Sequence, residues 1–253
     1  MIYDLQKASM WKRASAYILD IILLCIVATG FAFMLSAILG YDSYSSKLDS
    51  FYQAYEEKYS IDLDISAEDY EKLTDAEKAK YEEANKEFSK DTEVILTYNV
   101  IINMTLIMIT FGILAAYLLL EFFVPLLFNN GQTVGKKIFG IAITTTDGIK
   151  ISPFILFVRT IFGKFTIETM VPVFIVLMIM FEALGIVGII VIALLLILQI
   201  VMLSITKTNS AIHDLIANTV AVDLSSQLIF NTPEELLEYK KRVHAENVEK
   251  STY

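Results

Sequence analysis

The chain has 253 residues, of which 55% are hydrophobic and 19% are charged, and its mean hydropathy is +0.57. About a quarter of the residues in an ordinary soluble domain are charged, so this composition excludes a soluble enzyme, a disordered chain and a disulfide-stabilised scaffold. The single cysteine, Cys25, has no internal partner and lies within an apolar run, which argues against redox chemistry.

The net charge of −9 is concentrated in one segment. Residues 41–93 contain 16 acidic side chains and 7 lysines, and the rest of the chain is neutral. This acidic insert repels nucleic acid and anionic lipid, so neither is expected as its partner. It has no proline or glycine, and two hydroxyl residues placed three positions before acids predict short helices over 66–73 and 75–90. We interpret the insert either as a solvated helical cap on the first and second spans or as a surface that binds a protein or collects cations.

Three apolar runs are long enough to cross a bilayer, which requires about 20 residues. They cover 14–39, 94–128 and 167–205. The third run would be roughly 58 Å long as one helix, nearly twice the thickness of the hydrocarbon core. We therefore predict a hairpin that turns at 182–185, where a glutamate and a glycine interrupt the run. The expected fold class is an all-α polytopic membrane protein with four transmembrane helices, and three helices are the alternative.

The predicted organisation has six segments. A cytoplasmic N-terminus and the first span occupy 1–40, the extracytoplasmic insert occupies 41–93, and the second span occupies 94–128. A cytoplasmic loop follows over 129–165, and its last part, 153–165, is an interfacial helix. The transmembrane hairpin covers 166–206, and a cytoplasmic tail covers 207–253. Lysine and arginine gather in both tails and in the 129–165 loop, and the positive-inside rule places all three in the cytoplasm. Short strands over 141–145 and 219–222 are expected to pair there, with an Asp-Gly turn after the first.

Asp20 lies inside an apolar helix, where a charge costs about 2.5–3.5 kcal/mol on insertion scales. It therefore requires a partner, a proton or water. Arg13 lies seven residues earlier, roughly 10 Å along the helix axis, which is too far for a direct contact. Two interpretations stay open: a packing acid satisfied by Arg159 or by a hydroxyl group, and a cation or proton site.

The sequence contains no pattern that pairs a nucleophile with a base. The two histidines, His213 and His244, lack metal-ligand spacing. Residues 131–137 (GQTVGKK) are one residue short of a phosphate-binding loop and lack its hydroxyl side chain. We therefore expect no catalytic residues, no metal site and no cofactor, and we do not expect an enzyme.

Four short motifs occur in a specific order. They are 12–20 (KRASAYILD), 130–141 (NGQTVGKKIFGI), 152–159 (SPFILFVR) and 211–222 (AIHDLIANTVAV). Together they resemble the RDD family of bacterial integral membrane proteins, which is named for one arginine and two aspartates. By this resemblance the arginine is Arg13, and the aspartates are Asp20 and Asp214. Asn218 stands where the family pattern has a glycine, and the acidic insert lies outside the resemblance.

With four spans, four charged residues of these motifs would lie on or near the inner face. They are Arg13, Asp20, Arg159 and Asp214. One cluster of two bases and two acids would keep both aspartates charged at low dielectric. A loop motif follows the second span and comprises Gly131, Gln132, Gly135 and Lys136. Its glycines would let the chain fold back tightly. The cluster is interpreted either as a transport site or as a structural lock for the bundle.

The resemblance implies a multi-pass protein of the bacterial cytoplasmic membrane, with both termini cytoplasmic, and leaves two functions open. Transport, including sodium/proton antiport, is suggested for some members of the family, and the cluster would then bind monovalent cations or protons. Four spans are few for alternating access and no inverted repeat is evident, so a transporter would need a homodimer. The alternative is a non-catalytic scaffold or regulator that binds a membrane-protein partner through the insert.

Overall fold

The computed structural model describes residues 5–128, 130–181, 183–206, 208 and 210–251. The described part is mostly helical and contains one two-stranded sheet. The chain divides into two compact units, Thr29–Gly112 and the combination of Met1–Ala28 with Ile113–Tyr253. The first unit contains the acidic insert, and the second contains every candidate site residue. Each unit is described separately.

Four helical segments of the described residues are long and apolar enough to span a membrane, which confirms the predicted four-span fold. The first is α1 (Met10–Leu39), and the second consists of α5 (Thr92–Tyr117), η1 (Leu118–Phe123) and α6 (Val124–Leu127). The third consists of α8 (Pro153–Phe157), η2 (Val158–Met170) and α9 (Val171–Met180), and the fourth lies in α10 (Gly185–Ile205). Large apolar side chains such as Ile186, Ile189 and Leu194 are exposed on α10, as expected of a helix that faces lipid.

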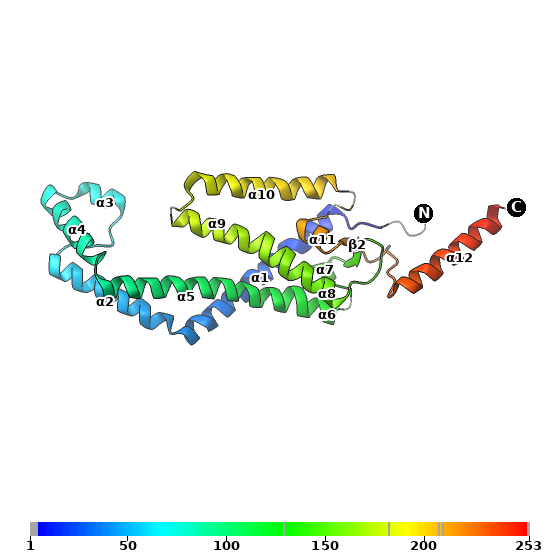
Figure 1. Cartoon of the computed structure of the whole chain (residues 1–253), viewed down its shortest axis with the longest axis horizontal. Coiled ribbons are helices and arrows are strands. Elements are labelled where there is room, and N and C mark those ends of the chain that lie inside the picture. The colour runs from blue at the N-terminus through cyan, green and yellow to red at the C-terminus, as the bar shows by residue number, and fades with distance from the viewer. Residues whose placement is uncertain (1–4, 129, 182, 207, 209, 252–253) are drawn as a thin grey trace. The chain divides into compact units, whose positions relative to one another are not determined.

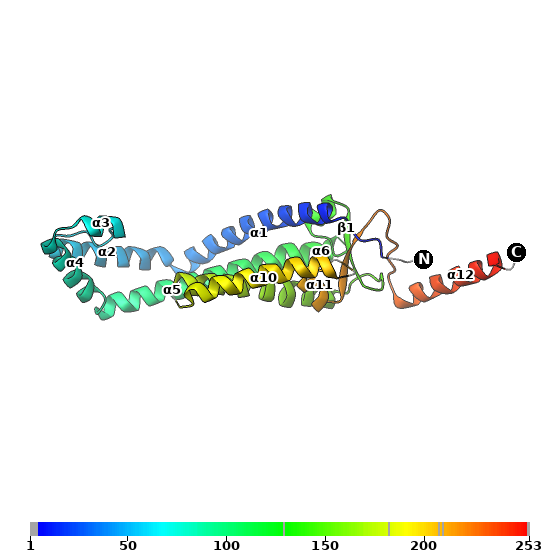
Figure 2. The same ribbon diagram turned by 90° about the horizontal axis from the view of Figure 1, so that it is seen from above.

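Helices α9 and α10 form the predicted hairpin and lie side by side (Figures 1 and 2). Helix α9 ends at Met180, and α10 begins at Gly185, whose φ is +48°. Glycine adopts this left-handed conformation without the steric cost of a Cβ atom, so the chain can reverse there. Glu182, which the sequence places in the same turn, lies outside the described residues.

The third span begins earlier than the sequence predicts. The sequence predicts an interfacial helix over 153–165 and a transmembrane hairpin over 166–206, whereas one continuous helix runs from Pro153 to Met180. That expectation assumed that Arg159 and Lys164 face the membrane surface. Both side chains are buried and form ion pairs with acidic residues of the same unit. Their charges are therefore compatible with a position inside a helix bundle.

The segments η1 and η2 wind as π-helices, in which hydrogen bonds run from residue i to residue i−5. At the end of η2, for example, the Val171 N–H donates to the Thr166 carbonyl, five residues earlier. Residues five apart then lie on one face of the helix. Arg159 and Lys164 would be separated by about 140° around an α-helix, but the wider winding turns both toward the same side.

Four short elements outside the spans form a unit that we term the loop module. They are α7 (Val134–Ile138), β1 (Ile141–Thr145), α11 (Ile212–Ile216) and β2 (Thr219–Asp223). The strands pair antiparallel, with Ile143 opposite Ala221, as predicted. The predicted turn after β1 is also present, because the Gly148 N–H donates to the Thr145 carbonyl. Figures 1 and 2 show the module at the end of the unit where α1 begins.

The hydrophobic core of this unit joins the loop module to the spans. Ile141 and Ile143 of β1 pack with Ala16 of α1 and Leu156 of α8, and all four side chains are fully buried. The other face of the sheet is covered as well, and Val220 there is also fully buried. The sheet therefore fixes the beginnings of two spans relative to the loop module.

Asn218, which stands where the family pattern has a glycine, lies between α11 and β2. Its φ is +52°. Asparagine enters the left-handed region more readily than other non-glycine residues. Its presence therefore preserves the turn that brings β2 back along β1.

The C-terminal tail forms α12 (Pro233–Ser251), which begins at the predicted proline. Glu234 and Glu235 lie in its first turn, where negative charge is favourable next to the positive end of the helix dipole. The aromatic rings of Phe230 and Tyr239 are in contact, with centroids 5.2 Å apart. This contact connects the helix to the segment that precedes it.

The acidic insert forms the helices α2 (Tyr41–Tyr59), α3 (Ala67–Lys72) and α4 (Asp75–Phe88) within the described residues. The last two match the predicted helices, and Thr74 with Glu77 forms a complete capping box. Helix α2 is absent from the sequence prediction, although its aromatic residues recur at helical spacing. The rings of Tyr52 and Tyr55 pack against Phe88, with centroid distances of 4.6 and 5.3 Å, so this aromatic face connects α2 to α4.

Candidate functional site

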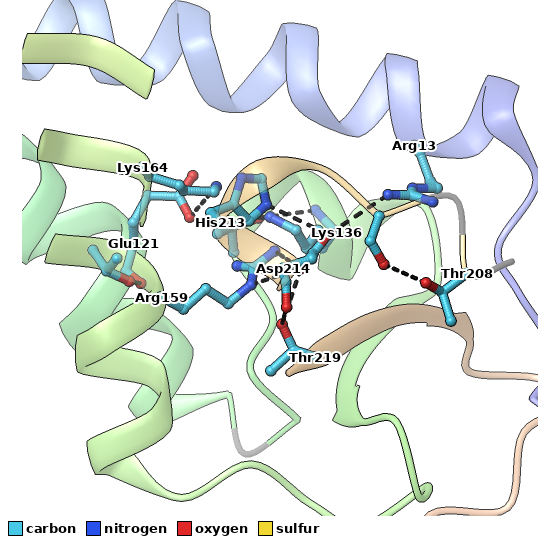
Figure 3. A network of polar contacts seen from close by, with 12 residues as sticks. Arg13, Glu121, Lys136, Arg159, Lys164, Thr208, His213, Asp214 and Thr219 are labelled. Atoms are coloured by element: carbon cyan, nitrogen blue, oxygen red, sulfur yellow. Dashed lines mark hydrogen bonds and ion pairs between the residues drawn. The ribbon is translucent and has the colours of Figure 1, made fainter. Parts of the chain in front are cut away.

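Asp214 of α11 is the centre of a buried ion-pair cluster (Figure 3). Arg159 of η2 reaches one carboxylate oxygen with Nη2 at 2.9 Å and Nε at 3.0 Å. Thr219 Oγ1 donates to the same oxygen at 3.0 Å, and Arg13 of α1 approaches the other oxygen at 3.7 Å. The side chains of Asp214 and Arg159 are only 1% and 2% exposed, so their charges are compensated by protein rather than by water.

Burial by itself acts to raise the pKa of Asp214. The positive charges of Arg159, His213 and Arg13 outweigh that effect and hold the pKa below its ordinary value. Asp214 is therefore ionised at neutral pH. Since one carboxylate joins α1, η2 and β2 in this way, the cluster connects two spans to the loop module.

Asp20 belongs to a separate cluster at the loop motif. Thr133 Oγ1 donates to its carboxylate at 2.5 Å, the Gly135 N–H donates at 2.8 Å, and Lys136 Nζ lies 3.5 Å away. Of the two interpretations of Asp20, these contacts favour the packing acid satisfied by a hydroxyl group. The predicted single cluster of two bases and two acids is thus divided, because Arg13 and Arg159 both bind Asp214.

The loop motif packs directly on α1. A Cβ atom at Gly135 would lie 2.3 Å from the Ala16 carbonyl oxygen and 2.9 Å from Asp20 Oδ1, so this close approach requires glycine. Gln132 Nε2 donates to the Ile141 carbonyl at 2.8 Å. A Cβ atom at Gly131, whose φ is +61°, would lie 2.5 Å from the Ile151 side chain. The motif therefore holds the chain between the second span and β1 in place.

Two further ion pairs are not among the sequence predictions. Lys164 Nζ lies 2.6 Å from Glu121 Oε2, and both side chains are less than a tenth exposed. His213 Nδ1 lies 2.8 Å from Glu168 Oε2, and the His213 N–H also donates to Glu168. One signal was available in the sequence: Lys164 and Glu168 are four residues apart in an apolar segment. Their partners lie 43 and 45 positions away in the chain, which spacing alone does not reveal.

Among the described residues of these clusters, the fixed charges balance. The four carboxylates are Asp20, Glu121, Glu168 and Asp214, and the four cationic side chains are Arg13, Lys136, Arg159 and Lys164. His213 is the additional titratable group. Its burial lowers its pKa below the ordinary value of 6.5 and outweighs the opposing effects of Asp214 and Glu168. The network is therefore neutral at neutral pH.

Two cavities adjoin these clusters. The first, of about 180 Å³, is lined by residues of the four spans and by Ile212. Its charged lining consists of the carboxylates of Asp20, Glu121 and Glu168 and the ammonium group of Lys164. We term it the acid-lined cavity. Its excess of negative charge favours a cation.

The second cavity, of about 300 Å³, lies between the spans and the loop module. Four cationic side chains line it, namely Arg13, Lys136, Arg159 and Lys164, together with Glu168, His213 and Asp214. We term it the base-lined cavity. Tyr17, Lys164, Glu168 and Gln199 line both cavities, so the two spaces are adjacent.

No group of three or more His, Cys, Asp or Glu side chains in the described part of the chain is arranged to hold a metal ion. The charged side chains of the clusters instead line the two cavities. A carboxylate and an imidazole in contact, such as those of Glu168 and His213, can exchange a proton.

Comparison with known proteins relates these features to one family. The model described as the RDD family matches residues 7–218, which include the charged residues of both clusters, both π-helical segments and the loop motif. Neither the curated proteins nor the solved structures include one that matches the chain.

Proposed function

The chain belongs to the RDD family, and from this premise we propose that it is a membrane transporter that exchanges a monovalent cation for a proton at the pair of Glu168 and His213. The family and the four apolar helices make it a multi-pass integral membrane protein. The proposal adds a transport site, which is the acid-lined cavity between the spans.

One observation supports this proposal more than any other. Within the described part of the acid-lined cavity, Glu168 is the carboxylate whose ion-pair partner can lose its charge near neutral pH. Glu121 is paired with a lysine, and Asp20 accepts hydrogen bonds from two donors beside a lysine. Glu168 is paired with His213, which is charged only when it is protonated. Competition between a proton and another cation is therefore concentrated at this pair.

The exchange step balances one positive charge against another. In the proton-bound state, protonated His213 pairs with the Glu168 carboxylate. When a monovalent cation enters the acid-lined cavity and binds Glu168, the proton leaves the imidazole and His213 becomes neutral. One charge enters and one leaves, so the exchange is electroneutral. Gln199 Oε1 is buried and has no hydrogen-bond partner among the described residues, which makes it available as a further oxygen ligand for the cation.

The transport rate should depend on pH in one direction. The pKa of His213 lies below 6.5 because of burial, so the neutral form that admits a cation predominates at neutral pH. As the pH on the His213 side falls below that range, protonation closes the site, and cation uptake should decrease. Stopped-flow uptake measured at several pH values on one side would show this profile.

The proposed orientation places both termini and the loop module in the cytoplasm. Four spans put both ends of the chain on one side of the membrane. Lys12 and Arg13 at the start of the first span, and Lys136 and Lys137 in the loop module, are the cationic groups that the positive-inside rule places there. His213 would then exchange its proton with the cytoplasm.

The test of the function is cation-driven proton movement in proteoliposomes. Purified full-length protein is reconstituted with a trapped pH indicator, and sodium, lithium or potassium is added outside. We expect each transported cation to release protons from the lumen, and Glu168→Gln to reduce the rate about tenfold or more, since it removes a charged ligand. Glu93→Gln is the matched control, because Glu93 is exposed and paired only with exposed Lys47 in the described chain; its rate should stay within about twofold.

Two results would contradict the proposal for these ions. One is proton release that is no faster with the native protein than in protein-free liposomes. The other is equal proton release by the native protein and by folded Glu168→Gln. Asp20→Asn is a less direct test than the sequence suggests. Its carboxylate holds Thr133 and Gly135, so a loss of transport in that variant would also follow from a loosened loop motif.

A second candidate function is the docking of a protein partner on the acidic insert. It is favoured by the internal packing of the insert, where α2 and α4 make a pair of aromatic contacts and Lys58 forms an ion pair with Glu87 at 2.6 Å. The surrounding acidic side chains are mostly exposed. Deleting residues 45–90 distinguishes the two functions. A transporter should keep most of its flux, whereas a regulator that acts through the insert should lose its effect.

A further inference from the structure

The base-lined cavity carries more positive than negative side chains. Of its charged lining, four groups are cationic at neutral pH and two are carboxylates, because His213 is neutral there. Glu121 and Asp20, which pair with Lys164 and Lys136, do not line it. The space therefore has an unbalanced positive lining, although the network as a whole is neutral. An anion in the cavity would be attracted by that lining.

Arg13 supplies the clearest unused donor of this cavity. Its Nη2 faces Asp214 at 3.7 Å, but its Nη1 is buried and has no hydrogen-bond partner among the described residues. Figure 3 shows Arg13 reaching from α1 toward Asp214. A buried guanidinium nitrogen without an acceptor is costly. The observation calls for an acceptor that the described chain does not provide.

Lys136 is the second group whose charge is incompletely compensated. Burial lowers its pKa to about 8, and the neighbouring Lys164 and Arg159 act in the same direction, whereas Glu121 and Asp20 oppose them. Its ion pair with Asp20 is long, at 3.5 Å. Lys136 Nζ also donates to Thr133 Oγ1 at 3.1 Å. Lys136 and Arg13 line the same cavity, so both attract an anion that enters it.

We propose that the base-lined cavity binds a phosphate-type oxyanion between Arg13 and Lys136. A tetrahedral oxyanion offers several acceptor oxygens, and an arginine fork with a nearby ammonium group suits that geometry. The volume of about 300 Å³ is large enough for such a group. This site goes beyond the proposed exchange at Glu168, because Arg13 and Lys136 do not line the acid-lined cavity and would take a ligand of opposite charge.

The position of the cavity leaves two sources for the oxyanion. It lies between the membrane spans and the loop module, with Met10 and Arg13 from the first turn of the first span on its wall. This is the level at which phospholipid headgroups meet a membrane protein. Free inorganic phosphate has the same chemistry. The experiment therefore needs one arm for each source.

The first arm measures binding of inorganic phosphate to the full-length protein in nanodiscs of neutral lipid, by isothermal titration calorimetry. The second arm measures co-purification of phosphatidylglycerol, by native mass spectrometry after equilibration in nanodiscs that contain it. We expect binding in at least one arm. Arg13→Gln should weaken that binding about tenfold, because a charge-assisted hydrogen bond is lost.

Lys12→Gln is the matched control, since Lys12 is the adjacent cation but pairs with Asp223 at 2.6 Å and does not line the cavity. Its binding should stay within about twofold. Arg13→Gln should fold, because Asp214 keeps its closer contacts with Arg159 and Thr219. If it does not fold, Lys136→Gln provides the same test. Phosphate binding alone would identify a free oxyanion as ligand, and lipid binding alone a headgroup. The proposal would be overturned if neither phosphate nor lipid binds. It would also be overturned if binding is unchanged in a folded Arg13→Gln or Lys136→Gln variant.

Discussion

Asp214→Asn should destabilise the protein by about 3–5 kcal/mol, which is the typical result of removing one partner from a buried ion pair. The substitution leaves Arg159, only 2% exposed, and Arg13 without their counter-charge. An asparagine side chain accepts at one oxygen and also presents N–H donors, one of which would face a guanidinium group or the Thr219 hydroxyl. A thermal melt of the purified protein in detergent, followed by size-exclusion chromatography, should show a midpoint lower by roughly 10 °C or more.

Asp223→Asn is the matched comparison for this experiment. Its partner Lys12 is 42% exposed, and surface ion pairs contribute about 0–1 kcal/mol. We expect only a small change in its melting temperature. A double variant tests the pairing directly, because Arg159→Met should recover part of the stability lost in Asp214→Asn. Equal melting temperatures for the two aspartate variants would show that the buried cluster does not stabilise the fold.

Gly163→Ala should destabilise the protein by about 3 kcal/mol, at the upper end of the range for overpacked sites. A Cβ atom at Gly163 would lie 2.5 Å from the Cβ atom and 2.7 Å from the Cα atom of His213. The second of these is backbone, so the clash cannot be relieved by a change of rotamer. Helix η2 and α11 would have to separate, and the ion pairs of Arg159 with Asp214 and of Glu168 with His213 would lengthen.

The same thermal assay, together with the proteoliposome assay, measures both consequences of Gly163→Ala. Gly30→Ala is the control, because a Cβ atom at that position of α1 meets no atom within 4 Å. Replacing an unstrained helical glycine by alanine is typically favourable by roughly 0.5–1 kcal/mol. The melting temperature should therefore stay constant or rise in Gly30→Ala and fall in Gly163→Ala. A wild-type midpoint for Gly163→Ala would mean that η2 and α11 are not held at this distance.

The sequence predicts the elements of this protein well wherever a local physical rule applies. Bilayer thickness sets the length of an apolar span, so four spans follow from hydropathy and from the impossibly long run 167–205. A threonine-rich stretch with an Asp-Gly turn predicts that a strand over 141–145 pairs with one over 219–222, and the second strand extends to Asp223. Hydroxyl caps predict α3 and α4. Helix α2 escapes prediction because it has no such cap. It begins after Gly40, whose φ is +71°, without a side-chain hydrogen bond.

The residues of the site were predicted only in part. Arg13, Asp20, Arg159 and Asp214 attract notice because charges are rare in apolar segments, and three of them meet in one cluster. Their partners were assigned less well, since Asp20 pairs with the loop motif and not with an arginine. The π-helical winding of η2 explains a further part of the difference. An α-helical projection places Arg159 and Lys164 on different faces, and neither hydropathy nor residue spacing predicts the change in winding.

By itself, the sequence determined that this is a mostly helical, multi-span membrane protein and favoured four spans over three. Burial of apolar surface and satisfaction of backbone hydrogen bonds in lipid depend on composition and spacing along the chain. The tertiary structure decided which charges compensate one another. It paired Glu168 with His213 and Lys164 with Glu121 across more than 40 residues, and it separated an acid-lined from a base-lined cavity. Electrostatic energies depend on distance and burial in space, and neither quantity can be read from sequence separation.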